Sequence, residues 1–135
     1  MRRRESAFRR ALVQELRKHG AFVVPLESGE TAIGIPDLYG CAGSPYFLEL
    51  KVEKGEGPNY KRKIAFRPGQ FPFLTRNEKE GGRSFIGIQY ENGVLFSRIF
   101  GVDQETRRFS LKKGYLWVPS ARGHGEEVLR WLTVR

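Results

Sequence analysis

The residues best suited to chemistry lie in two short stretches, one ending at Asp37 and the other containing Glu49 and Lys51. In an extended strand, Glu49 and Lys51 project from one face because successive side chains alternate. Leu48 and Leu50 project from the other face, which we expect to lie on the core. The polar face of this strand is therefore the first candidate for a functional site.

Small and turn-forming residues at 40–45 separate this strand from Asp37 and predict a β-hairpin. If the hairpin is centred on Gly43, residues at equal distances from it oppose each other, which pairs Asp37 with Glu49. Directly opposed residues have Cβ atoms about 4.5–5.5 Å apart on one face. Two carboxylates at that separation repel each other, so we expect a cation between them.

The chemistry of the pair favours a hard divalent metal. Carboxylate ligands without nearby Cys or His favour Mg²⁺ or Mn²⁺, and Mg²⁺ commonly binds through one or two carboxylates, waters and phosphate. Lys51 on the same face could hold a water that attacks the phosphorus of a bound phosphate ester. Its charge could also balance the negative charge that develops in the transition state of that reaction. The alternative is that the Glu-x-Lys alternation marks a solvent-facing side of the sheet and that Asp37, after Pro36, is a turn residue.

Composition points to a polyanionic partner. The 135 residues include 24 Lys and Arg against 15 Asp and Glu, which gives a formal net charge of +9. Such charge favours nucleic acid, although ribosomal and membrane-surface proteins share it. No apolar run approaches the roughly 20 residues that span a bilayer. With the single Cys41 and two histidines, neither an intrachain disulfide nor a structural zinc site is expected. We therefore expect one domain over 1–135 in a reducing, intracellular setting such as the cytoplasm. We expect it not to bind membranes.

The polar stretch 53–67 is too long for an ordinary connection, so we expect it to be either functional or mobile. Its basic side chains are the candidate nucleic-acid contacts, and a solvated loop is the alternative. These side chains are Lys54, Lys61, Arg62, Lys63 and Arg67. Tyr60 and Phe66 could stack on an unpaired base. Basic residues at 107–108 and 112–113 are a second candidate strip, whose aromatic neighbours Tyr115 and Trp117 could equally belong to the core.

Hydrophobic periodicity and turn signals predict alternating helices and strands. The expected elements are a helix at 6–19, strands at 21–26, 33–39 and 46–52, a helix at 68–80, strands at 84–90 and 94–99, a strand within 109–118 and a helix at 126–132. The Asn92-Gly93 pair is a strong hairpin signal between the two strands that follow the second helix.

Pro36-Asp37 followed by Glu49-Leu50-Lys51 resembles the signature of PD-(D/E)XK nucleases. The surrounding pattern, over about 5–90, is similar to the VRR-NUC branch and the Holliday junction resolvases. It includes Ser28-Gly29 and a Gly34-Ile35 pair before Pro36. The resemblance implies an α/β fold with a restriction-endonuclease-like αβββαβ core, in which helices flank a mixed central sheet.

The resemblance also implies roles for individual residues. Asp37 and Glu49 would ligate the metal, with the carbonyl of Leu50 as a further ligand, and Lys51 would be catalytic. Gln70 matches a glutamine that this family places beside the lysine, although it could equally be a surface residue at a helix start.

An acid on the first helix commonly joins this site, and here Glu5 and Glu15 compete for the place. Glu5 matches the pattern of the VRR-NUC branch better. Glu15 is less exposed to fraying of the helix end, and either acid could simply be solvated.

The function expected from these residues is metal-dependent hydrolysis of DNA phosphodiester bonds by an endonuclease. Structure-specific cutting of flaps, junctions or nicks, in repair, recombination or phage DNA processing, is the expected role. Symmetric cutting of a junction needs two sites, which would favour a homodimer. The alternatives are a noncatalytic nucleic-acid-binding module and a restriction-type endonuclease.

Overall fold

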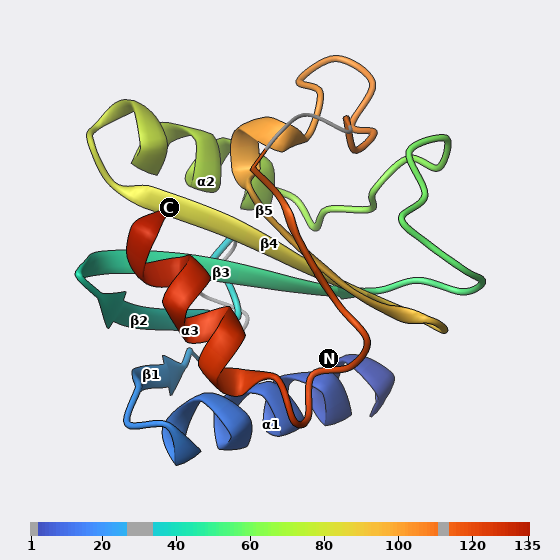
Figure 1. The fold of residues 1–135 in the computed structure, drawn as a ribbon. Helices are drawn as coiled ribbons and strands as arrows, with labels where there is room; N and C mark the ends of the chain where they lie inside the picture. The colour runs from blue at the N-terminus through green and yellow to red at the C-terminus, as the bar shows by residue number, and fades with distance from the viewer. Residues whose placement is uncertain (1–2, 27–33, 111–113) are drawn as a thin grey trace.

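The computed structural model describes residues 3–26, 34–110 and 114–135. Within them the backbone forms one mixed sheet of six strands, in the spatial order β1-β2-β3-β4-β5-β6 (Figure 1). The strands are β1 Phe22–Pro25, β2 Leu38–Ala42, β3 Ser44–Val52, β4 Arg83–Tyr90, β5 Gly93–Arg98 and β6 Leu116–Val118. The helices are α1 Arg3–Lys18, α2 Gln70–Lys79 and α3 Gly125–Val134, with a 3-10 turn η1 at Ile99–Gly101. This is the predicted α/β class, and the first six elements follow the predicted order αβββαβ.

Both faces of the sheet are covered. Helices α1 and α3 pack on one face, and α2 lies on the other (Figure 1). The first layer is mainly apolar; it includes Phe8, Leu12, Leu16, Leu48, Leu50, Phe85, Phe96, Val128 and Leu132. The second layer includes Phe71, Leu74, Ile86, Ile88, Leu95 and Ile99. Strands β3 and β4 are parallel, because α2 is the crossover between them. Their central position explains why both faces of β3 are buried.

The hairpin of β2 and β3 has the predicted register, with Leu38 opposite Leu48 and Ala42 opposite Ser44. Gly43 sits at the tip with φ of 79°, a left-handed conformation that glycine adopts without steric cost. The predicted centre of the hairpin is therefore confirmed.

The bounds of this hairpin differ from the prediction, because the residues expected in the turn belong to the strands. Strand β2 begins at Leu38 rather than at 33, and β3 begins at Ser44 rather than at 46. A Cβ on Gly40 would lie 2.3 Å from the Tyr46 hydroxyl, so the small residue makes room for the Tyr46 ring. The residues at 27–33, with the Ser28-Gly29 pair of the sequence pattern, lie outside the described residues.

The other elements were predicted with smaller errors. Helix α2 begins two residues later than expected, at Gln70, because Gly69 adopts a left-handed φ of 84°. Of the described residues within the strand predicted at 109–118, Leu116–Val118 pair with β5, whereas Phe109 forms an isolated bridge with Val102. Among the described residues no helix is both long enough and apolar enough to cross a membrane.

Candidate active site

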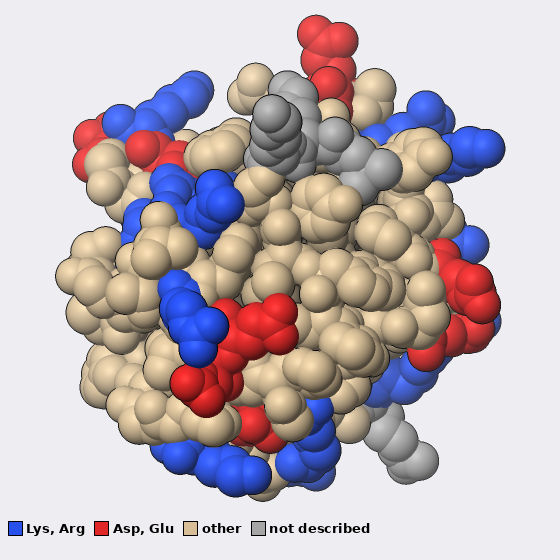
Figure 2. All heavy atoms as spheres, viewed as in Figure 1, with Lys and Arg blue, Asp and Glu red and all other residues tan. Residues whose placement is uncertain are grey.

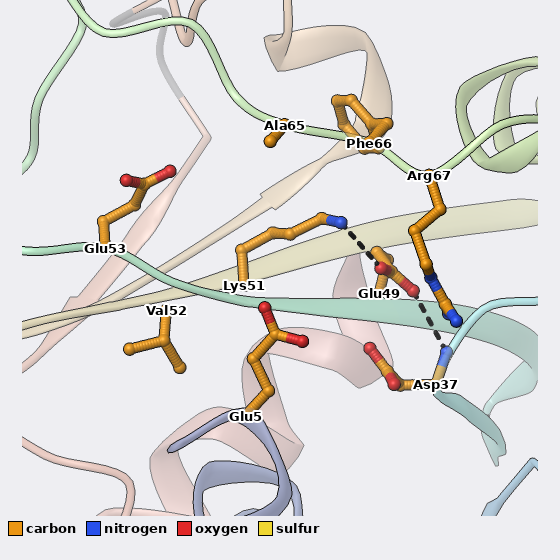
Figure 3. A pocket seen from close by; sticks show the side chains of 9 residues that line it. All are labelled: Glu5, Asp37, Glu49, Lys51, Val52, Glu53, Ala65, Phe66 and Arg67. Carbon is orange, nitrogen blue, oxygen red and sulfur yellow. Dashed lines mark hydrogen bonds and ion pairs between the residues drawn. The ribbon is translucent and has the colours of Figure 1, made fainter. Parts of the chain in front are cut away.

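Asp37 and Glu49 lie side by side at the end of the β2–β3 hairpin. Asp37 directly precedes β2, and continuing the register by one residue places it opposite Glu49. The backbone N–H of Asp37 donates to Glu49 Oε1 at 3.2 Å, and the backbone N–H of Leu50 donates to Asp37 Oδ2 at 2.9 Å. Their exposed fractions are only 4% and 1%. Both carboxylates face the same pocket (Figure 3).

Lys51 brings a buried cation to this pair. Its Nζ lies 3.1 Å from Glu49 Oε2 and donates to Gln70 Oε1 at 3.0 Å. The ammonium also lies 5.1 Å from the centre of the Phe66 ring. These three contacts fix the ammonium beside Glu49 (Figure 3).

Gln70 is the first residue of α2 and is fully buried. Its Oε1 accepts from Lys51 Nζ and from the backbone N–H of Arg67 at 2.8 Å. The opposite end of the amide, Nε2, is buried without a hydrogen-bond partner among the described residues. Since a buried donor is nearly always satisfied by protein, water or ligand, this orphaned N–H points to a site completed by a further group.

The electrostatics of the pair are unfavourable in the absence of a metal. Burial and, next, the neighbouring charge of Asp37 together raise the pKa of Glu49 to about 8, and Lys51 offsets them only in part. Two adjacent buried carboxylates cannot both be ionised cheaply. Either a proton or a cation must therefore accompany them.

The pocket over these residues has a volume of about 550 Å³. Its lining consists of Glu5, Asp37, Glu49, Lys51, Val52, Glu53, Ala65, Phe66 and Arg67. Figure 3 shows the Glu5 carboxylate rising from α1 toward the pocket. Glu53 continues the two-residue alternation of Glu49 and Lys51, and this signal could have identified it from the sequence.

Glu15, the competitor of Glu5, lies elsewhere. Its Oε1 accepts from the backbone N–H of Gly123 at 3.0 Å, and its Oε2 lies 3.2 Å from His19 Nε2. The Gly123 hydrogen bond is the main cause that lowers the pKa of Glu15. Glu15 thus ties α1 to the segment before α3, and Glu5 is the acid of α1 that lines the pocket.

The donor set fits a hard divalent ion that is held mainly by non-protein ligands. Among the described residues no three or more His, Cys, Asp or Glu side chains gather closely enough to hold a metal by themselves. Asp37 and Glu49 supply two carboxylates, which is a common protein contribution to a Mg²⁺ site completed by water and phosphate. Lys51 contacts one Glu49 oxygen and would have to share or release it.

The five basic residues predicted to contact DNA all lie on the connection between β3 and α2, and all are exposed. This connection projects from the end of β3 (Figure 1). It is anchored where Lys63 pairs with Arg108 and where Ile64 is buried. Arg62 forms an ion pair with Glu53 at 3.2 Å, and Arg67 reaches the pocket.

Charge is unevenly spread over the surface. On the face that carries α3, uncharged atoms fill the centre, and Lys and Arg side chains lie mainly at the periphery (Figure 2). On α3 itself, Glu126 forms an ion pair with Arg130 at 3.2 Å. The second candidate strip for nucleic acid was predicted from the basic residues at 107–108 and 112–113. Residues 112–113 lie outside the described residues, and the neighbouring Trp117 packs against the buried core.

No protein-family model and no curated protein matches the chain. Among solved structures, a Holliday junction resolvase from the archaeal hyperthermophile Archaeoglobus fulgidus, Hjc, is similar, with a TM-score of 0.57 and 16% sequence identity. The match covers 80% of this chain and 88% of the resolvase chain. At this identity the similarity shows the fold alone. The chain therefore has the restriction-endonuclease-like α/β fold expected from its sequence, and membership of the VRR-NUC branch stays a prediction.

Proposed function

We propose that this protein is a divalent-metal-dependent nuclease that hydrolyses DNA phosphodiester bonds. One observation carries the proposal: Asp37 and Glu49 are buried side by side, with the Lys51 ammonium 3.1 Å from Glu49. Burying ionisable groups together costs stability, so perturbed clusters of this kind concentrate at functional sites. The location of the cluster in a pocket, rather than in the closed core, favours function over structure.

Each residue has a role that follows from its position. Asp37 and Glu49 would hold Mg²⁺ or Mn²⁺, and the resemblance to PD-(D/E)XK nucleases adds the Leu50 carbonyl as a further ligand. When bound, the metal supplies a water of lowered pKa and stabilises negative charge on the phosphate. Lys51 holds the attacking water or balances the charge that develops on phosphorus.

Gln70 positions Lys51 through its Oε1. The unpartnered Nε2 of the buried amide would donate to a water held within the site. Glu5 reaches the pocket from α1 and would bind the waters of the metal.

DNA binding would rest on the exposed basic residues of the β3–α2 connection and on the net charge of +9. The similar archaeal protein is described as a Holliday junction resolvase. Junctions, flaps and nicked duplexes are therefore the substrates to compare here. If junctions are cut symmetrically, two copies of this chain must act together.

A noncatalytic nucleic-acid-binding module is the second candidate. Its specific support is that Lys51 already places a cation 3.1 Å from Glu49, so that a metal is not the only possible source of positive charge beside the pair. Such a module would bind DNA with the same salt dependence, but divalent ions would not stabilise it.

The two candidates differ in their response to metal, and Asp37→Asn provides the decisive variant. Asparagine keeps the size of the side chain and an oxygen that accepts from the Leu50 N–H, but it removes the charge that would bind a metal. Thermal melts should show the parent stabilised by Mg²⁺ or Mn²⁺, by about 2.7 kcal/mol at a hundred times the dissociation constant. A panel of labelled DNA structures should be cut only in the presence of metal.

Asp37→Asn should lose both responses, whereas Glu126→Gln, an exposed acid on α3, should keep both. Full metal stabilisation of Asp37→Asn would show that Asp37 is not a ligand. A parent that binds DNA but cuts no form of it with either metal would favour the noncatalytic module.

A further inference from the structure

A second groove adjoins the candidate active site. It has a volume of about 740 Å³, and residues 65–67 line both the groove and the active-site pocket. The groove extends from this shared segment to the turn at 103–108, which approaches because Lys63 pairs with Arg108. A chain molecule bound in the pocket can therefore continue into the groove across residues 65–67.

The charge of this groove suits a phosphate backbone. Its described lining includes three cations, Lys63, Arg67 and Arg107, against one carboxylate, Glu105. Lys63 is exposed, and Arg107 is half-buried. A cationic groove continuous with a phosphodiester-cutting site would bind the phosphates next to the one that is cut.

Arg107 gives the groove a flat surface. Its guanidinium lies 3.8 Å from the centre of the Phe71 ring, and Phe71 packs edge-on against Phe66 at 5.2 Å. Phe66 in turn lies beneath the Lys51 ammonium. A continuous row of side-chain contacts thus leads from Lys51 to Arg107. Phe71 lies against one face of the planar guanidinium, and Nη1 donates to the Gln104 carbonyl. Because Arg107 lines the groove and is only half-buried, we expect its other face to accept a base.

The backbone at Arg107 supports a dedicated position for this side chain. Arg107 has φ of 59°, a left-handed conformation that is unusual for a residue with a Cβ. Two hydrogen bonds hold it there: its N–H donates to the Asp103 carbonyl at 2.8 Å, and its own carbonyl accepts from Ile64 N–H at 2.8 Å. Such conformations persist where the surrounding structure imposes them, often at ligand contacts.

We propose that this groove binds an unpaired DNA strand that adjoins the scissile phosphate, with a base stacked on Arg107 and a phosphate on Lys63. A base within a duplex has its faces covered by its neighbours, so stacking on Arg107 selects a single-stranded segment. The substrate class is therefore DNA with a flap or an overhang at the cut, rather than continuous duplex. The part of this inference that places the cut beside the bound strand rests on the proposed nuclease function. The part that assigns strand binding to the groove does not.

Binding without metal tests the groove separately from catalysis. Fluorescence anisotropy in EDTA would compare three labelled DNAs of one sequence: a single strand, a blunt duplex and a duplex with a single-stranded overhang. Arg107→Lys keeps the charge and removes the flat guanidinium. It should weaken binding of the single strand and the overhang about fivefold or more and leave the blunt duplex unchanged.

Lys63→Gln supplies an independent test, because this exposed side chain can be replaced without loss of packing. It should weaken binding of the same two DNAs and reduce the salt dependence on the single strand by about 0.7 in log-log slope, the value for one lost phosphate contact. Arg130→Gln is the matched control, because Arg130 is exposed on α3 and outside the groove. It should bind all three DNAs like the parent.

Two results would overturn the inference: unchanged binding of the single strand by both variants, or an equal loss on all three DNAs. If Arg107→Lys melts at a lower temperature, Lys63→Gln decides the question alone. A parent protein that binds the single strand but cuts no DNA in the presence of metal would reject only the nuclease function. A parent protein that cuts DNA, with both groove variants binding the single strand as the parent does, would reject only the groove.

Discussion

The two faces of β3 place opposite chemistry on a single strand. Leu48 and Leu50 enter the apolar layer beneath α1 and α3 and are almost fully buried. Glu49 and Lys51, which alternate with them, are also buried, but in a polar site under the β3–α2 connection. The first face contributes hydrophobic free energy, whereas the second places ionisable groups away from water at a cost.

This difference shows why alternation alone does not distinguish a surface from a site. A Glu-x-Lys pattern is typical of a solvent-facing side of a sheet, yet Glu49 and Lys51 are only 1% and 8% exposed. The solvent-facing interpretation is therefore wrong. A central strand that pairs with a parallel neighbour is covered on both sides, so its polar residues are buried together with its apolar ones.

The largest effect should separate the two faces at neighbouring positions. Leu48→Ala leaves a cavity in the apolar layer and should lower the free energy of unfolding by about 2–5 kcal/mol. Glu49→Gln should leave it nearly unchanged or raise it, because glutamine resembles the protonated Glu49 favoured at neutral pH. Urea unfolding of both variants at pH 7 measures the difference. Equal losses would mean that the polar face also stabilises the fold.

The pH dependence of stability should report on the same carboxylate. Because the pKa of Glu49 is about 8 in the folded protein and about 4.5 when unfolded, the folded state binds the additional proton between these values. Its contribution is fully present below about pH 4.5 and is lost as the pH rises through about 8. Asp37, Lys51, Glu5 and Arg67 line the same pocket and also contribute charge.

Metal-free melts of the parent and Glu49→Gln across this range isolate the Glu49 contribution. The parent should lose stability relative to the variant as the pH increases. Parallel curves would show that Glu49 ionises normally in the folded protein.

Catalysis should depend on Lys51 more than stability does. Lys51→Met removes the cation from Glu49, but the carboxyl can remain protonated, so the melting temperature should change little. Cleavage should fall about a hundredfold or more, as when a group that stabilises transition-state charge is removed. Lys79→Met, an exposed lysine in the last turn of α2, is the control for loss of charge. Cleavage at the parental rate would exclude a catalytic role for Lys51.

Local geometry explains how much of the site was predictable. The register that places Asp37 beside Glu49 follows from one glycine turn and the two-residue period, and both can be read from neighbouring residues. The contact of Arg107 with Phe71 was not predictable. It joins residues distant in the sequence through a left-handed backbone conformation for which arginine gives no signal. The choice between Glu5 and Glu15 depended on how α1 crosses the sheet, which is also a long-range property.

The smallest expected effect distinguishes the two acids of α1. Glu5 lines the pocket and would contact the metal through water, so Glu5→Gln should raise the metal concentration for half-maximal cleavage about tenfold. Its metal-free melting temperature should stay near that of the parent. Glu15→Gln should do the reverse, because the carboxylate binds Gly123 N–H and His19 outside the pocket. Its melting temperature should fall, while the metal requirement stays unchanged.

Metal titrations of cleavage, run beside melts in EDTA, give both quantities for each variant. A raised metal requirement in Glu15→Gln with none in Glu5→Gln would exchange the two roles and place the third acid of the site in the last turn of α1.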